Sequence, residues 1–288
     1  MKRKIPLFGL MILLGIYISY KTIEKNKIIE NNKIIVDIVL KNSFQEENII
    51  KKISNTRINW DKSIRLLKKD YESVTEEEII RYQEPIIYLY NSHPTEEYHP
   101  STIGEYSLNP GVTMNNYILE DILEKNGYKT YVEEASVKDI LNNNGWNYAY
   151  SYQASRLLLE QRKKEYPSLE YFIDIHRDSL DHERTTIQIE DRSYAKLLFI
   201  VGLENENYEA NLEFTEKINQ RLEEQYPNLS KGIYKKEGAG VNGVYNQDFS
   251  PKTILIEIGG YENTTVEVLN STIAFAKCYL EVLNEESH

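Results

Sequence analysis

Runs of consecutive apolar residues alternate with amphipathic stretches along the chain from residue 84 onward. The apolar runs are short and rich in Ile, Leu, Tyr and Phe, which predicts buried strands at 85–90, 129–134, 169–176, 185–190, 195–203 and 252–260. Apolar residues at helical spacing predict helices at 113–128, 150–166, 208–226 and 265–286. Strands of this kind, separated by helices, are typical of a largely parallel sheet covered on both faces. We therefore expect a three-layer α/β domain over residues 84–288.

The first 20 residues have a different pattern. Residues 5–20 are uncharged and strongly apolar and follow Lys2, Arg3 and Lys4, which is typical of an export signal or a membrane anchor. At ~1.5 Å per residue the stretch reaches about 24 Å, slightly less than a hydrocarbon core of ~30 Å. It ends in bulky residues, without the small residues of a cleavage site. We predict an uncleaved anchor at 1–20, which makes the protein single-pass and places its remainder outside the cytoplasm.

Residues 21–83 are charged, rich in Asn and poor in long apolar runs. Short pieces of this stretch have helical spacing, but none of them contains a pattern that indicates chemistry. We interpret it as a spacer with short helices between the anchor and the α/β domain.

Charge and composition exclude several classes of function. The net charge is −11, with 45 acidic residues against 34 basic ones, so no broad positive field exists to bind nucleic acid. The single cysteine, Cys278, excludes an internal disulfide and a zinc site with several thiolates. The sequence has no Gly-x-Gly-x-x-Gly, P-loop or Gly-x-Ser-x-Gly motif, so nucleotide and serine-hydrolase chemistry are not supported.

Titratable residues stand at the ends of three predicted strands: His93, His176 and Glu257. In open α/β sheets the ligand site lies outside the carboxyl ends of the strands, so these residues are expected to converge. A lone histidine is more often a hydrogen-bonded structural residue, and a glutamate is usually solvated. Glu257, however, has isoleucine on both sides, and a carboxylate on a buried strand is costly unless it is compensated. Two of the five histidines share this placement, which favours a functional site.

These residue types support zinc hydrolysis. His93 and Glu96 lie at i and i+3, and with His176 they form a set of two imidazoles and one carboxylate. A catalytic zinc ion takes three such ligands and leaves its fourth position to water. Glu257 is then the candidate base that takes the proton of the water.

Other residues near these positions are less specific. Arg177 and Asp178 directly follow His176, and they could contact the substrate and steady the ligands, or form an ordinary ion pair. His182 does not belong to a His-Glu-x-x-His helix, because residue 186 is threonine.

Four segments resemble the stage II sporulation protein P family of endospore-forming bacteria. They read "IIYLYNSHPTEEY", "YSYQASRLLLE", "YFIDIHRDS" and "GVYNQDFSPKTILIEIGGYENTTVEV". The resemblance covers residues 84–285 and includes the single N-terminal anchor. The Asn-Gln-Asp block followed by Leu-Ile-Glu-Ile-Gly-Gly is its most specific part. The chain departs from the family in having Pro94 after the first histidine, where Thr-His-Thr or a similar sequence is usual, and in its short spacer.

The resemblance implies a zinc-dependent peptidoglycan hydrolase with the fold of the N-acetylmuramoyl-L-alanine amidases. Such an enzyme cuts the bond between N-acetylmuramic acid and the L-alanine of the stem peptide, and is also credited with cleavage of peptide cross-links. It implies a role in septal wall thinning and engulfment, at the sporulation septum, with the stage II sporulation proteins D and M as partners.

The family's residues map onto this chain one by one. Its metal ligands correspond to His93, Glu96 and His176, and its catalytic glutamate corresponds to Glu257. Further candidates to contact the substrate or support the site are, besides Arg177 and Asp178, Tyr98, Asn246 and Gln247. Tyr98 is equally compatible with a packing role.

Two other functions stay open at this stage. A zinc carboxypeptidase-like wall peptidase has a similar ligand pattern, but it needs a basic clamp for a free carboxylate, for which Arg177 is the one obvious candidate. A tethered wall-binding protein without activity is the alternative from another class, although the complete set of two histidines and two glutamates argues against it.

Overall fold

The structure of the protein is a computed structural model that describes residues 82–98 and 110–287. The predicted anchor at 1–20 and almost all of the predicted spacer at 21–83 lie outside these residues. Among the helices that are described, none combines the length and the apolar character needed to cross a membrane.

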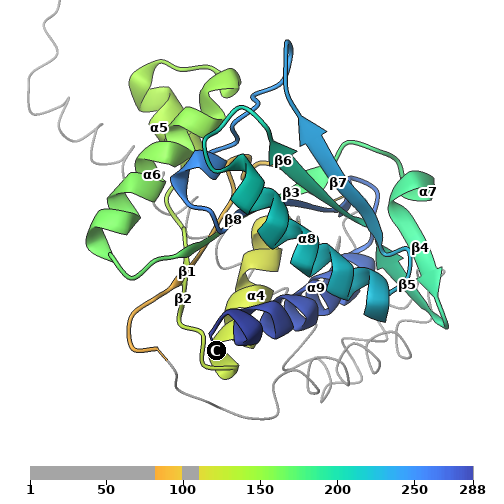
Figure 1. The fold of residues 1–288 in the computed structure, drawn as a ribbon. Coiled ribbons are helices and arrows are strands. Elements are labelled where there is room, and N and C mark those ends of the chain that lie inside the picture. The colour runs from red at the N-terminus through yellow and green to blue at the C-terminus, as the bar shows by residue number, and fades with distance from the viewer. Residues whose placement is uncertain (1–81, 99–109, 288) are drawn as a thin grey trace, which may run out of the picture.

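A six-stranded, mostly parallel sheet forms the centre of the molecule, as the apolar pattern predicts (Figure 1). Its strand order is β2-β1-β3-β8-β6-β7. The first four of these strands are parallel to one another, whereas β6 runs antiparallel to β8, and β7 is parallel to β6. The bounds are β1 (Ile87–Tyr90), β2 (Thr130–Val132), β3 (Tyr171–Asp178), β6 (Leu197–Gly202), β7 (Ser230–Lys236) and β8 (Thr253–Gly260).

One face of the sheet is mostly apolar and is covered by three long helices. These are α4 (Thr113–Lys125), α8 (Tyr208–Gln225) and α9 (Thr265–Glu286). They pack on alternate residues of the strands, such as Ile173 and Ile256, and together form the main hydrophobic core. Because side chains alternate between the two faces of a strand, the residues between these positions belong to the opposite face.

The opposite face carries the polar residues of the strands. Its helices are α5 (Val137–Asn144), the short 3₁₀ helix η3 (Tyr148–Tyr150) and α6 (Ser151–Glu165), which lie at the upper left in Figure 1. Leu159 of α6 packs with Tyr88, Tyr90 and Phe172, and α5 packs on α6. The register places Tyr90 beside Asp174, and His176 beside Glu257. Three neighbouring strands therefore present hydroxyl, carboxylate and imidazole groups on one face.

The chain between β3 and β6 differs from the simple alternation of strands and helices. After a short helix α7 (His182–Thr185), the strand expected at 185–190 forms as β4 (Thr186–Ile189), but it pairs with β5 (Arg192–Ala195) in a separate two-stranded sheet. The connection is a tight turn in which Glu190 has φ +53°. Before β8 lies the 3₁₀ helix η4 (Gln247–Phe249).

Candidate metal centre

His93 and Glu96 lie on a tight turn that follows β1. The backbone N–H of Glu96 donates to the carbonyl of His93 at 3.2 Å, so the two residues are the first and fourth of a hydrogen-bonded turn. Pro94 is the second residue of this turn, a position that proline favours because its φ is already near the required value. The proline that departs from the family pattern is therefore compatible with a turn that brings His93 and Glu96 together.

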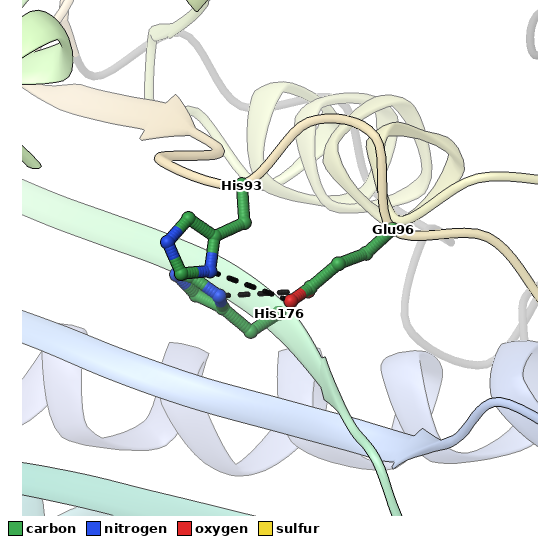
Figure 2. Close-up of side chains that lie close together, drawn as sticks. All are labelled: His93, Glu96 and His176. Carbon is green, nitrogen blue, oxygen red and sulfur yellow. Dashed lines mark ion pairs between the residues drawn. The ribbon is translucent and has the colours of Figure 1, made fainter. Parts of the chain in front are cut away.

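The structure brings the three predicted ligands together (Figure 2). The Nδ1 atom of His93 lies 3.4 Å from Glu96 Oε1, and the Nδ1 atom of His176 lies 3.5 Å from Glu96 Oε2. One ligand atom from each residue lies within 4.8 Å of the other two. Two imidazoles and one carboxylate are a donor set that zinc takes in catalytic sites, so these residues could hold a zinc ion.

A buried carboxylate, Asp174, fixes the orientation of His176. Its Oδ1 lies 3.0 Å from His176 Nε2 and also accepts from the backbone N–H of Ser92 at 2.9 Å. Ser92 Oγ lies 3.0 Å from the same imidazole nitrogen. With Nε2 engaged in this way, Nδ1 is the nitrogen that faces Glu96. A ligating histidine commonly donates its other ring nitrogen to a carboxylate, so this arrangement fits a metal centre.

The charges in the centre are coupled. Burial by itself would raise the pKa of Glu96, but hydrogen bonds from His176 and His93, the charge of His176 and the N–H of Arg177 lower it to about 2. For His176, burial opposes protonation, but Asp174, Glu96 and Glu257 outweigh it and raise the pKa of the imidazole well above its usual value. The carboxylates around His176 favour a positive charge on its imidazole. A cation bound at Nδ1 of His176 would supply that charge in place of the proton.

Glu257 lies one strand away from this cluster, in register with His176. Its side chain is partly buried, but Oε2 is fully buried and has no hydrogen-bond partner in the described part of the chain. Burial raises the pKa of Glu257 to about 7; the charge of His176 opposes the shift, and Glu96, Asp178 and Asp174 add to it. A buried carboxylate oxygen without a partner destabilises the fold, so its presence beside a ligand cluster indicates a functional role.

Arg177 and Asp178 surround the cluster without entering it. The backbone N–H of Arg177 donates to Glu96 Oε2 at 3.0 Å, and its guanidinium donates to the carbonyl oxygens of Glu97 and Asp178 at 2.9 and 3.3 Å. Asp178 Oδ2 forms an ion pair with Lys231 Nζ at 2.9 Å. Arg177 thus secures the segment that carries Glu96, and a substrate contact by either residue stays a prediction.

Tyr98 lies in the hydrophobic core and is 1% exposed. Its hydroxyl donates to the carbonyl of Ile258 at 3.0 Å and accepts from Asn115 Nδ2 at 3.0 Å. This position corresponds to the packing role that the sequence left open.

Asn246 and Gln247 shape the loop before β8. Asn246 has φ +56° and donates to the carbonyl of Tyr152 and to Ser155 Oγ, both at 3.0 Å. Gln247 accepts from the N–H of Gly202 at 2.8 Å and donates to the carbonyl of Ile200 at 2.7 Å. Their amide groups thus connect the loop to α6 and β6, and the predicted substrate contacts stay predictions.

The sequence alone did not single out four side chains that contact the cluster: Ser92, Asp174, Tyr148 and Tyr152. Asp174 had a usable signal, because it lies two residues before His176 on a strand and therefore shares its face. Tyr148 had none, and Tyr152 had only its place in the segment "YSYQASRLLLE". Their rings lie 4.8 and 5.2 Å from the ring of His93, but they reach it from η3 and α6 through tertiary packing.

The fold and the cluster define an α/β protein with a candidate metal centre of two histidines and one glutamate. A sequence model described as stage II sporulation protein P matches residues 2–279, and the chain belongs to this family. The chain is 34% identical over 203 residues to the stage II sporulation protein P of Bacillus subtilis (strain 168). That match covers 68% of this chain and 51% of the relative, so the chain spans about half the length of the relative.

The backbone of this chain is similar to that of the CwlD amidase from Clostridioides difficile, whose structure was solved in complex with the GerS lipoprotein. The similarity has a TM-score of 0.45 and a sequence identity of 12%, and it covers 70% of this chain and 98% of the amidase chain.

Proposed function

We propose that this protein is a zinc-dependent peptidoglycan hydrolase that cuts the amide bond between N-acetylmuramic acid and the L-alanine of the stem peptide. Membership of the stage II sporulation protein P family supports this proposal. The observation that carries it is the convergence of His93, Glu96 and His176, whose ligand atoms lie within 4.8 Å of one another, with Glu257 in register beside His176.

Each residue of the cluster has a role in this chemistry. Zinc, when bound, supplies a Lewis acid that polarises the scissile carbonyl and makes water a better nucleophile. His93, Glu96 and His176 would hold the ion, and Asp174 keeps the imidazole of His176 in the required orientation. Glu257 accepts a proton from the attacking water as oxygen bonds to the carbonyl carbon. The same carboxyl group then gives the proton to the alanine nitrogen as the carbon–nitrogen bond breaks.

The surroundings of Arg177 favour this reaction over that of a carboxypeptidase. A carboxypeptidase needs a cation that is available to bind a terminal carboxylate, but the guanidinium of Arg177 donates to two backbone carbonyls. The unpartnered oxygen of Glu257 likewise supports hydrolysis over passive binding, because a binding protein has no need of such a group.

The family and the N-terminal sequence support a location and partners for this activity. The proposed anchor at residues 1–20 tethers the hydrolytic domain outside the cytoplasm, at the sporulation septum, in a complex with the stage II sporulation proteins D and M. Membrane fractions of sporulating cells test this: the full chain should sediment with membranes and co-purify with both proteins, and recovery in the soluble fraction alone would contradict it.

The products of wall digestion test the reaction itself. Purified peptidoglycan is incubated with the zinc-loaded protein, with the protein after chelation, and with the chelated protein after zinc is restored, and new ends are identified by mass spectrometry. We expect glycan strands with unsubstituted muramic acid and free peptides that begin with L-alanine, only when zinc is present. Cleaved cross-links would show the additional endopeptidase activity, and release of terminal residues without free muramic acid would contradict the proposal.

A further inference from the structure

Two exposed tyrosines stand beside the candidate metal centre. Tyr148 is 51% exposed and Tyr150 is 46% exposed, and both lie on η3; we call them the η3 tyrosines. Among the described residues the only other large apolar or aromatic side chains exposed to this degree are Leu157 and Tyr234. Two of these four exposed side chains thus lie on one turn of helix.

The backbone of η3 is fixed on both sides. Asn147 Oδ1 accepts from the N–H of Ala149 at 2.9 Å, and Ser151 Oγ donates to the carbonyl of Tyr148 at 2.7 Å. The ring of Tyr150 stacks on Trp146 at 5.7 Å between centroids, and Trp146 packs against the core between α5 and α6. Exposed rings held in this way lose little conformational entropy when they bind a ligand.

Tyr148 reaches the first metal ligand directly. Its ring centroid lies 4.8 Å from that of His93, at an interplanar angle of 31°. Tyr152 lies 5.2 Å from the same imidazole but is less exposed than Tyr148. A substrate whose scissile bond lies at His93 would therefore lie next to the half-exposed ring of Tyr148.

The chemistry of the surface indicates which side of the substrate it contacts. The scissile amide of the proposed function joins a neutral sugar to a peptide that carries carboxylates. Neither of the η3 tyrosines carries a charge that would attract those carboxylates. A tyrosine ring offers an uncharged flat face with a hydroxyl at its edge, which matches the C–H face and hydroxyl groups of a pyranose.

We propose that the η3 tyrosines form a binding site for the glycan, with Tyr148 against the muramic acid ring at the scissile bond and Tyr150 against the adjoining sugar. This inference rests on the proposed function and adds a determinant of its specificity. It predicts that the protein recognises the sugar through aromatic contacts on η3.

Alanine substitutions test the site, with Tyr234→Ala as the matched control. Tyr234 is 49% exposed and lies on β7, an edge strand that β3, β8 and β6 separate from β1. We expect Tyr148→Ala to raise KM about tenfold for soluble disaccharide-peptide substrates while kcat changes less than about twofold. Tyr148→Phe keeps the ring, so its KM should stay within about threefold of the wild-type KM. The increase in KM caused by Tyr150→Ala should become larger as the glycan of the substrate becomes longer.

Binding to peptide-free glycan strands, measured by calorimetry on the zinc-loaded protein, separates this proposal from the proposed function. Weaker binding by Tyr148→Ala, with wild-type binding by Tyr234→Ala, supports the site even if no muramoyl amide is cut. Wild-type glycan affinity in both Tyr148→Ala and Tyr150→Ala, or loss of affinity for sugar-free stem peptides instead, would overturn it. Equal melting temperatures of the variants show that the fold is intact.

Discussion

Asp174 is a charged group in direct contact with His176 that the sequence alone did not single out. It is fully buried, and Oδ1 engages both His176 and the backbone N–H of Ser92, whereas Oδ2 has no partner among the described residues. A buried carboxylate in this position orients the imidazole and makes its free nitrogen a better ligand. Asp174 is therefore a positioning residue of the proposed zinc centre.

Substitution Asp174→Asn removes the charge and keeps the shape of this side chain. We expect zinc affinity to fall about 10- to 100-fold, because the imidazole of His176 loses the carboxylate that orients and polarises it. Competition with a chelating dye measures the affinity. Asp121→Asn is the control, since Asp121 pairs with Lys125 on α4, and it should bind zinc like wild type. Unchanged affinity in Asp174→Asn, or an equal loss in the control, would contradict this role.

Residues at strand ends were predictable, and residues that approach from helices were not. His93, His176 and Glu257 follow or end apolar runs, and parallel strands bring such ends together. No local pattern connects Tyr148 with His93, because their contact depends on how η3 and α6 dock on the sheet. The amides of Asn246 and Gln247 belonged to a recognisable block, but only the structure shows which backbone groups they bind.

At the scale of elements, the start of α9 is held by an unusually dense set of bonds. Thr264 and Glu267 form a capping box, in which each side chain bonds the backbone of the other residue. The carboxylate of Glu267 also accepts from Ser193 Oγ at 2.7 Å and from Asn263 Nδ2 at 3.2 Å, and it lies 3.1 Å from His182 Nε2. This network explains the position of His182 without any metal.

The pKa of Glu267 makes this network sensitive to pH. Burial alone would raise the pKa, but hydrogen bonds from Thr264, Ser193 and Asn263 and the charge of His182 lower it below its usual value. A depressed carboxyl pKa stabilises the fold above the unfolded-state pKa of about 4.3, and this contribution is lost as the pH falls through the folded-state pKa.

Glu267→Gln should therefore lower the free energy of unfolding by about 1 to 2 kcal/mol at neutral pH, with a smaller difference below about pH 4. Urea unfolding of the metal-free protein at several pH values measures the difference. Glu285→Gln, on the exposed side of the same helix, should change stability by less than about 0.5 kcal/mol. A difference for Glu267→Gln that stays constant or grows as the pH falls would refute the assignment.

Strands with consecutive apolar residues were predictable, whereas partly exposed strands were not. β1, β3, β6 and β8 are buried along almost their whole length, and their sequences show it. No residue of β7 is fully buried, and its sequence "SKGIYKK" contains three lysines and no apolar run. The sequence therefore did not predict this strand. β5 is four residues long and became recognisable only through its pairing with β4.

At the scale of the whole molecule, one face of the sheet forms the main hydrophobic core and the other face carries the candidate metal centre. The face under α4, α8 and α9 is apolar and supplies most of the buried surface. The face toward α5 and α6 carries Tyr90, Asp174, His176 and Glu257, where polar atoms without partners reduce stability. Such local destabilisation is tolerable because the apolar face maintains the fold, and it is typical of sites kept for chemistry.

The division between the faces also shows where prediction from sequence ends. The alternation along β3 indicates that Asp174 and His176 share a face, but it does not say which face is covered by long helices. That depends on the packing of α9, which begins far from β3 in sequence and fills the apolar side. The sequence therefore predicted the class of fold and the convergence of His93, Glu96 and His176 better than it predicted the walls of the site.

Glu257 connects the fold to the proposed reaction, and one paired measurement on Glu257→Gln tests the account most directly. Glutamine keeps the shape of the side chain but cannot accept a proton from water. We expect zinc content equal to that of wild type and hydrolysis of purified peptidoglycan lower by about 10²- to 10⁴-fold. Glu160→Gln, on the exposed side of α6, serves as the matched control and should hydrolyse at the wild-type rate. Near-wild-type hydrolysis by zinc-loaded Glu257→Gln would contradict the assignment of Glu257 as the base.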